Sequence, residues 1–131
     1  MINKSVTIGL LQQSRIKSIE LNLETTIQEI KESAKKGAQI ICLQELFLST
    51  YFCQSENPNQ FKLSETIPGP TTNVLSRLPK ELSVVIIAPL FENRTEGIYH
   101  NTAVIIDADG SIVGSYRKMH SPDDPYFYEK F

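Results

Sequence analysis

The sequence has little of what marks disulfide-stabilised, metal-binding or nucleic-acid-binding proteins. Tryptophan is absent, and the 131 residues include two cysteines and two histidines. Cys42 and Cys53 make no disulfide framework, and His100 and His120 stand alone, without the spacing of metal ligands. The formal net charge is -2, so no basic field attracts nucleic acid. Neither a metal centre nor a nucleic-acid partner is expected.

Long hydrophobic runs and glycine-rich loops are lacking too. The longest apolar stretches are far too short to span a bilayer, and the opening "MINKSVTIGLLQQ" has too short an apolar core for a secretory signal. No glycine-rich phosphate-binding loop is present. These absences predict a cytoplasmic protein with reduced thiols and no membrane association.

The first part of the chain predicts a strand, a helix and a second strand. Residues 6–11 and 39–43 are short apolar runs typical of buried strands. The segment 19–38 between them has helical periodicity, acids at its front, lysines near its end, and a suitable stop at Gly37. This order favours parallel pairing of the two strands. The apolar face of the helix comprises Leu23, Ile27, Ile30 and Ala34.

The middle of the chain predicts a loop followed by a helix. Residues 49–70 carry no clear period, and long loops in compact domains are often functional. Residues 70–82 predict a helix with Pro70 in its first turn, which Pro79 should kink or shorten. The apolar face of this helix comprises Val74, Leu78 and Leu82.

The last part of the chain predicts antiparallel strands. Residues 84–92 form a continuous apolar run, expected at the centre of a sheet with both faces buried. Residues 99–107 and 111–118 are further strands, joined by "DADG" as a tight hairpin turn. The predicted fold class is α/β with a mixed sheet, in one domain over residues 1–131. The aromatic ending "YFYEKF" predicts that this domain is incomplete at its C-terminus.

One carboxylate interrupts an apolar segment. In "IICLQELFL", Glu45 follows a predicted buried strand and precedes Leu46 and Phe47. Functional sites in α/β sheets are built at the carboxyl ends of strands, so Glu45 is a candidate general base. The alternative is a solvated acid in a loop.

Several other residues are candidates with simpler explanations beside them. Lys118 ends a predicted strand and is either a functional cation or a solvent-facing guard of the sheet edge. Arg117 should point to the opposite face and be structural. Glu129 has aromatic neighbours that would half-bury it. Cys42 is expected in the core. Cys53 is a candidate thiol nucleophile that lacks a strand-to-helix elbow.

Four segments together resemble the N-terminal part of the carbon–nitrogen hydrolase (nitrilase) superfamily. Within it, "QELFLSTYFCQ" and "KMHSPDDPYFYEKF" look most like N-carbamoylputrescine amidases. The resemblance implies a four-layer α-β-β-α sandwich, usually assembled into homo-oligomers, and no metal or organic cofactor. The segments follow the family's order with compatible spacing and are "GAQIICLQELF", "IPGPTTNVLSRLPKEL", "YHNTAVIIDADGSIVGSYRKMH" and "YEKF".

The resemblance implies roles for three of the candidates. The family's general base corresponds to Glu45, the lysine of its "YRK" motif to Lys118, and its second active-site glutamate to Glu129. The implied reaction hydrolyses N-carbamoylputrescine to putrescine, carbon dioxide and ammonia, so the expected partner is a small N-carbamoyl amine. If these roles hold, the three side chains should converge in space.

The resemblance also leaves a gap, and three interpretations stay open. The family's nucleophile is a cysteine on a later strand-to-helix elbow, which neither Cys42 nor Cys53 matches. The chain is the front of an amidohydrolase, whose substrate would alternatively be that of a β-ureidopropionase or an ω-amidase, and it is expected to be inactive alone. Otherwise it is a non-catalytic fragment, or one that pairs with a separate C-terminal half, and it exposes apolar surface. The third interpretation is a thiol enzyme that uses Cys53.

Overall fold

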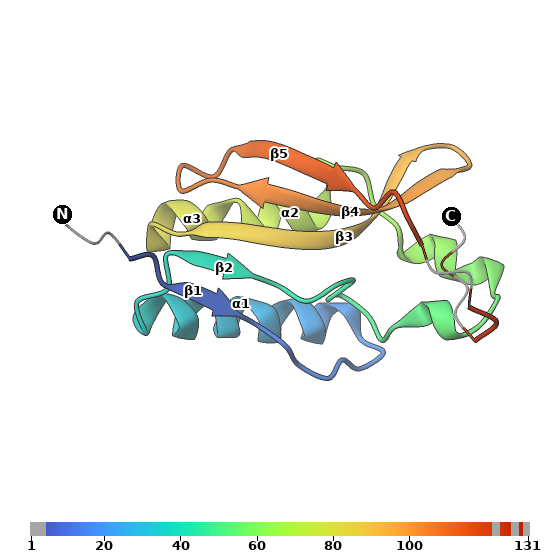
Figure 1. Ribbon diagram of the computed structural model, residues 1–131, viewed down its shortest axis with the longest axis horizontal. Helices are drawn as coiled ribbons and strands as arrows, with labels where there is room; N and C mark the ends of the chain where they lie inside the picture. The colour runs from blue at the N-terminus through green and yellow to red at the C-terminus, as the bar shows by residue number, and fades with distance from the viewer. Residues whose placement is uncertain (1–4, 122–123, 127–128, 130–131) are drawn as a thin grey trace.

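A five-stranded mixed sheet forms the centre of the computed structural model, which describes residues 5–121, 124–126 and 129 (Figure 1). The strands lie side by side in chain order; β1, β2 and β3 pair in parallel, whereas β3, β4 and β5 pair antiparallel. The predicted α/β class with a mixed sheet is confirmed. The strands are β1 (Ile8–Leu10), β2 (Ile40–Cys42), β3 (Val85–Thr95), β4 (Ile98–Ile106) and β5 (Ile112–Arg117).

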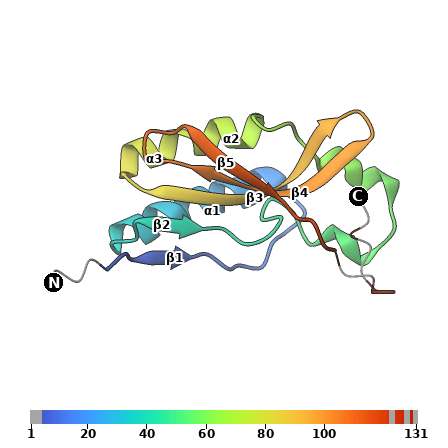
Figure 2. The same ribbon diagram turned by 45° about the horizontal axis from the view of Figure 1, so that its top comes forward.

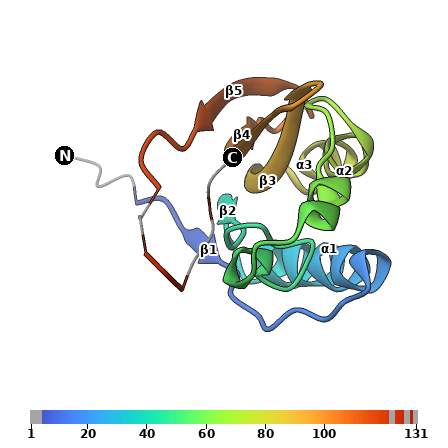
Figure 3. The same ribbon diagram turned by 90° about the vertical axis from the view of Figure 1, so that its right-hand side faces the viewer.

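All three α-helices cover the same face of the sheet (Figure 3). The longest, α1 (Ile19–Lys35), is capped at its N-terminus by Ser18, whose hydroxyl accepts a hydrogen bond from the Leu21 backbone N–H. It stops before Gly37, which takes the left-handed conformation (φ 93°) that glycine adopts at helix ends. Helix and sheet enclose the main core, whose fully buried members include Ile30, Ile41, Phe47, Leu75, Ile86, Val104 and Ile106.

The second helical segment is broken, as the proline in it predicts. It comprises α2 (Pro70–Leu75) and α3 (Arg77–Leu82), which meet at Ser76. Pro79 has no backbone N–H to donate to Leu75 four residues earlier, and its ring crowds that carbonyl. The helix therefore ends one turn before the proline.

The loop after β2 contains two short 3₁₀ helices, Phe52–Gln54 and Pro58–Leu63. They lie at the same end of the molecule as the β3–β4 hairpin (Figure 2). Phe52 packs against Phe91 with tilted rings whose centroids lie 4.9 Å apart, and Phe61 packs in the same way against Tyr99 at 4.5 Å. These contacts make a second, smaller core that ties the loop to β3 and β4.

The other face of the sheet is largely uncovered, which corrects two expectations. β1 is not buried: Ile8 and Leu10 are 58 % and 77 % exposed. From Val85 to Leu90 the residues of β3 alternate between half-buried and buried, so this part of the strand is fully buried only on the helix side. Among the described residues, this open face carries apolar side chains across the sheet, which confirms the expected exposed apolar surface. The open face, as named below, comprises Ile8, Leu10, Cys42, Ile87, Ala103, Ile105 and Tyr116.

Candidate active site

Glu45 lies in a tight turn just past the carboxyl end of β2. The next residue, Leu46, has a positive φ of 50°, an uncommon conformation for a branched residue that costs about 1–2 kcal/mol. Burial of the Leu46 side chain offsets that cost. The turn therefore directs the half-exposed Glu45 away from the core, while Leu46 and Phe47 stay inside it.

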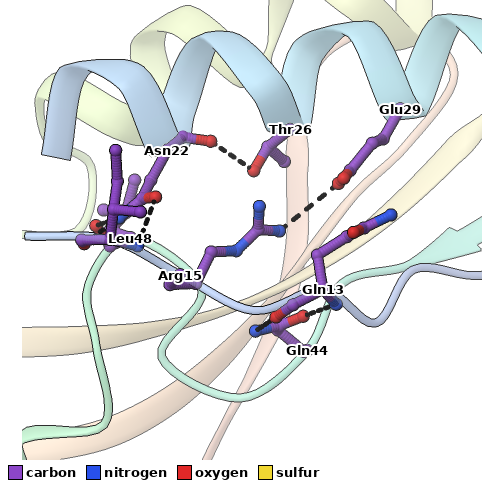
Figure 4. A network of polar contacts seen from close by, with 8 residues as sticks. Gln13, Arg15, Asn22, Thr26, Glu29, Gln44 and Leu48 are labelled. Atoms are coloured by element: carbon purple, nitrogen blue, oxygen red, sulfur yellow. Dashed lines mark hydrogen bonds and ion pairs between the residues drawn. The ribbon is translucent and has the colours of Figure 1, made fainter. Parts of the chain in front are cut away.

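Side-chain hydrogen bonds hold this turn on both sides of Glu45 (Figure 4). Gln44 accepts from the Gln13 backbone N–H and donates its own amide to the Gln13 carbonyl, at 2.7 Å. The buried Asn22 on α1 donates to the carbonyl of Leu48 at 2.9 Å. Glu45 thus lies between Gln44 and Leu48, each of which is hydrogen-bonded to a distant part of the chain. Further contacts in the same region join Arg15 to Glu29 and Thr26 to Asn22.

Lys118 follows the last residue of β5, and its backbone N–H still donates to the carbonyl of Asn101 on β4. Side chains alternate along a strand, so Lys118 and its neighbour Arg117 point to opposite faces. Arg117 pairs with the buried Glu92 through two hydrogen bonds, at 2.7 and 2.8 Å. The prediction that Arg117 faces away from Lys118 is confirmed.

Glu45, Lys118 and Glu129 meet in one cluster. The Lys118 ammonium donates to Glu45 Oε1 at 3.2 Å and to Glu129 Oε2 at 2.7 Å. The three side chains differ in exposure: 48 % for Glu45, 30 % for Lys118 and 1 % for Glu129. The expected convergence is confirmed, and Glu129 is more deeply buried than its sequence context indicates.

The charge state of Lys118 follows from its surroundings. Burial alone lowers the pKa of this ammonium, but hydrogen bonds to Glu129 and Glu45, together with their negative charges, raise it above its usual value. Lys118 therefore stays positively charged at neutral pH, between two carboxylates.

Asn101 and Tyr51 complete the cluster and were not among the residues singled out from the sequence. The Asn101 amide donates to Glu45 Oε1 at 2.7 Å and to Glu129 Oε1 at 2.8 Å. The Tyr51 hydroxyl donates to Glu129 Oε2 at 3.4 Å. The one signal for Asn101 was a polar residue inside the apolar strand "YHNTAVIID".

Cys53 is buried beside this cluster in the second core, with Leu46, Phe52 and Phe91. Burial raises the pKa of its thiol to about 11; the Tyr51 hydroxyl and Lys118 oppose this shift, and the carboxylates of Glu129 and Glu45 add to it. A thiol with this pKa is neutral at pH 7, and the thiolate is the nucleophilic form. The environment of Cys53 thus argues against the third interpretation.

The remaining candidates lie apart from the cluster. Cys42, half-buried in β2, belongs to the open face and not to the core as expected. His100 on β4 faces the Glu92 side of the sheet, and His120 is exposed. Among the described residues, no three His, Cys, Asp or Glu side chains are placed to hold a metal ion.

The cluster lies at one end of the open face, since Lys118, Asn101 and Tyr116 share that side of β4 and β5. It combines a half-exposed carboxylate, a fixed cation and a buried carboxylate. Such a set can accept a proton and stabilise a developing oxyanion.

Comparison with known proteins identifies the family. The carbon–nitrogen hydrolase family model matches residues 7–131. The chain belongs to the carbon–nitrogen hydrolase family. The predicted membership is confirmed.

Two curated relatives illustrate the relationship. The N-carbamoylputrescine amidase of Solanum lycopersicum is 40 % identical over 130 residues, which cover 98 % of this chain and 43 % of the relative. The citrullinase of Francisella tularensis is 35 % identical over 128 residues, 97 % of this chain and 44 % of the relative. The chain thus spans less than half the length of these relatives.

The same extent is matched in solved structures. A carbon–nitrogen hydrolase from Helicobacter pylori superposes with a TM-score of 0.89 at 45 % identity, over 95 % of this chain and 43 % of that one.

No described helix in the chain is both long enough and apolar enough to cross a membrane.

Proposed function

We propose that these residues form the base-and-cation part of a ureido hydrolase that cleaves N-carbamoylputrescine. The single observation that carries the proposal is the Lys118 ammonium, held within 3.2 Å of Glu45 and 2.7 Å of Glu129 at the end of an open sheet face. Support for the substrate comes from relatives named N-carbamoylputrescine amidase at 40 % identity.

In this proposal Glu45 is the general base. A cysteine thiol from beyond the 131 residues transfers its proton to Glu45 and attacks the ureido carbon. The charge that develops on the carbonyl oxygen faces the Lys118 ammonium, which needs no reorganisation to stabilise it. Glu129, held by Lys118, Asn101 and Tyr51, keeps that ammonium in place.

The same groups serve the rest of the reaction. Glu45 returns the proton to the departing nitrogen, which releases putrescine and leaves a carbamoyl thioester. Glu45 then takes a proton from water as the water attacks the thioester, and the thiol is restored. The released carbamic acid breaks down to carbon dioxide and ammonia.

The exposed apolar side chains of the open face support the proposal. Its apolar side chains continue up to the cluster through Tyr116, which is 61 % exposed. A contiguous apolar patch of this kind marks a surface that another segment or protein covers. We infer that the remaining half of the enzyme covers this face, closes the site and carries the nucleophile.

A second substrate deserves a direct comparison because of a specific similarity. Citrulline carries the same ureido group as N-carbamoylputrescine, and a citrullinase is 35 % identical to this chain. Both substrates would use Glu45 and Lys118 identically and differ in the group beyond the ureido nitrogen. The 49–70 loop packs beside the cluster. In this proposal the loop contacts that group and thereby distinguishes the two substrates.

The test uses the protein at its natural length with Glu45→Gln. Glu24→Gln is the matched control, since Glu24 is an exposed acid on α1. Amine and ammonia release are measured with N-carbamoylputrescine, citrulline, N-carbamoyl-β-alanine and an ω-amide. Loss of the general base should lower kcat/KM about 10²–10⁴-fold on the true substrate, while Glu24→Gln stays near wild type.

The outcomes separate the competing interpretations. Fastest turnover of citrulline or the ω-amide would keep the mechanism and change the substrate. A folded wild-type protein that turns over none of the four compounds would overturn the enzyme proposal in favour of a non-catalytic role.

A further inference from the structure

Asn101 occupies a rigid position beside the proposed catalytic groups. It lies within β4 opposite Phe91 of β3, and its carbonyl accepts the Lys118 backbone N–H at 2.9 Å. Its side chain is buried. The sheet therefore fixes Asn101 from both sides, in contrast to Glu45, which is carried by a turn.

One amide nitrogen contacts both carboxylates. Asn101 Nδ2 lies 2.7 Å from Glu45 Oε1 and 2.8 Å from Glu129 Oε1. Ionised carboxylates only accept hydrogen bonds, so the NH₂ group and not the amide oxygen must face them. The two N–H groups are divided between the two acids, and the bridge carries no charge of its own.

The bridge leaves the two carboxylates unequal. Within the described part of the chain, both contacts of Glu45 end on Oε1, whereas Glu129 uses both oxygens. No hydrogen bond from these described groups ends on Glu45 Oε2, and the Glu45 side chain is 48 % exposed. Since two negative charges this close repel each other, donors between them are needed to hold this arrangement.

We propose that Asn101 is a positioning residue: its amide holds Glu45 and Glu129 apart around Lys118 and directs Glu45 Oε2 toward the reacting group. This inference rests on the proposed function. An amide suits the role because it does not titrate, so the geometry persists over the pH range in which Glu45 must exchange protons.

The experiment compares Asn101→Ala and Asn101→Asp with wild type at natural length. Asn101→Ala should lower kcat about 10- to 100-fold with KM changed less than about 3-fold, because the base is mispositioned and not removed. The acid limb of the pH–rate profile should move to higher pH, since the carboxylates lose a donor. Asn101→Asp should move it further, because it adds a third negative charge.

Thr102→Val is the matched control. Thr102 is the next residue on the same strand, buried, and donates to a carboxylate, Glu92, on the opposite face. This variant loses a comparable hydrogen bond and should leave the pH profile unmoved. If Asn101→Ala changes stability and activity no differently from Thr102→Val, with an unmoved pH profile, the proposal is wrong.

Carbon-13 NMR of the side-chain carboxyl carbons at pH 7 tests the bridge without activity. Asn101→Ala should change the carboxyl chemical shifts of both Glu45 and Glu129, because each loses a hydrogen-bond donor, and Thr102→Val should change neither. The other titratable groups facing these acids are Lys118, Tyr51 and Cys53, which both variants retain. Unchanged chemical shifts in folded Asn101→Ala and Asn101→Asp would overturn the inference even if the protein hydrolyses none of the ureido compounds.

Discussion

Two ionic clusters occupy opposite faces of β4 and β5. Residues of one cluster are directly adjacent in the sequence to residues of the other. On the helix-covered face, Arg117 and Thr102 hold Glu92. On the open face, Lys118 and Asn101 hold Glu45 and Glu129. The period-two alternation of β4 and β5 sends adjacent polar residues into different environments.

The difference between the clusters lies in how many partners each cation has. Arg117 forms a two-pronged pair with one carboxylate, which its planar guanidinium matches, and every Glu92 oxygen contacts it. Lys118 is a point charge shared between two acids, one of which is half exposed. The first arrangement is closed and suits stability; the second keeps a carboxylate oxygen accessible and suits chemistry.

The largest expected effect comes from removing the shared cation. Lys118→Met in the natural-length protein should lower kcat/KM about 10²–10³-fold, because the developing oxyanion loses its fixed positive charge. Steady-state kinetics on N-carbamoylputrescine measure it. Lys80→Met, an exposed lysine on α3, is the control and should be silent. Near-wild-type kinetics for Lys118→Met would show that the two clusters do not differ in function.

Much of this comparison could be predicted from the sequence. Strand periodicity placed Arg117 and Lys118 on opposite faces, and the family resemblance picked out Glu45, Lys118 and Glu129. Asn101 was missed because its role depends on the register of β4 against β5 and on a turn far away in the chain. No local pattern contains that information.

The exposure of β1 also could not be predicted from its local sequence. An apolar run such as "VTIGLL" indicates a strand, but the number of faces that are covered depends on what packs against the sheet. The turn at Leu46 escaped notice for a different reason: its positive φ occurs without glycine and is held by burial. The aromatic residues Phe127, Tyr128 and Phe131 of "YFYEKF" lie outside the described residues.

The closed cluster should respond to Glu92→Gln in stability and not in catalysis. Charge-assisted hydrogen bonds from Arg117 and Thr102 are lost, which should cost about 2–3 kcal/mol at pH 7. Urea unfolding with a parallel activity assay measures both. A loss of kcat comparable to that of Lys118→Met would contradict the separation of the two faces.

The pH dependence of that loss follows from the ionisation of Glu92. Burial alone raises the pKa of this carboxyl, but hydrogen bonds from Arg117 and Thr102 and the Arg117 charge hold it below its usual 4.5. A carboxyl with a lowered folded-state pKa contributes stability above its unfolded-state pKa and loses it as pH falls through the folded-state value. The stability gap between wild type and Glu92→Gln should therefore narrow below about pH 4.5. A gap that is constant from pH 7 to pH 3 would contradict the lowered pKa.

A smaller stability loss is expected for Thr102→Val. It removes one hydrogen bond to Glu92, at 2.6 Å, while Arg117 still pairs with that carboxylate. The expected cost is about 1–2 kcal/mol in the free energy of unfolding, with unchanged kcat. If urea unfolding gives a loss as large as that of Glu92→Gln, Thr102 and not Arg117 dominates the closed cluster.

The smallest effect on stability is expected on the open face itself. Ile105 is partly exposed, and it pairs with Gly114 on β5, which has no side chain. A longer side chain at position 105 therefore causes no steric clash with its cross-strand neighbour. Ile105→Lys in the 131-residue chain should change the free energy of unfolding by less than about 0.5 kcal/mol. It should also reduce self-association in sedimentation velocity, because it places a charge in the apolar patch. Under the proposed function, the remaining half covers this face, so the same charge in the natural-length protein would be buried unpaired and activity should fall. Equal tolerance in both contexts would mean that nothing covers this face, and that the cluster at its end functions in the open.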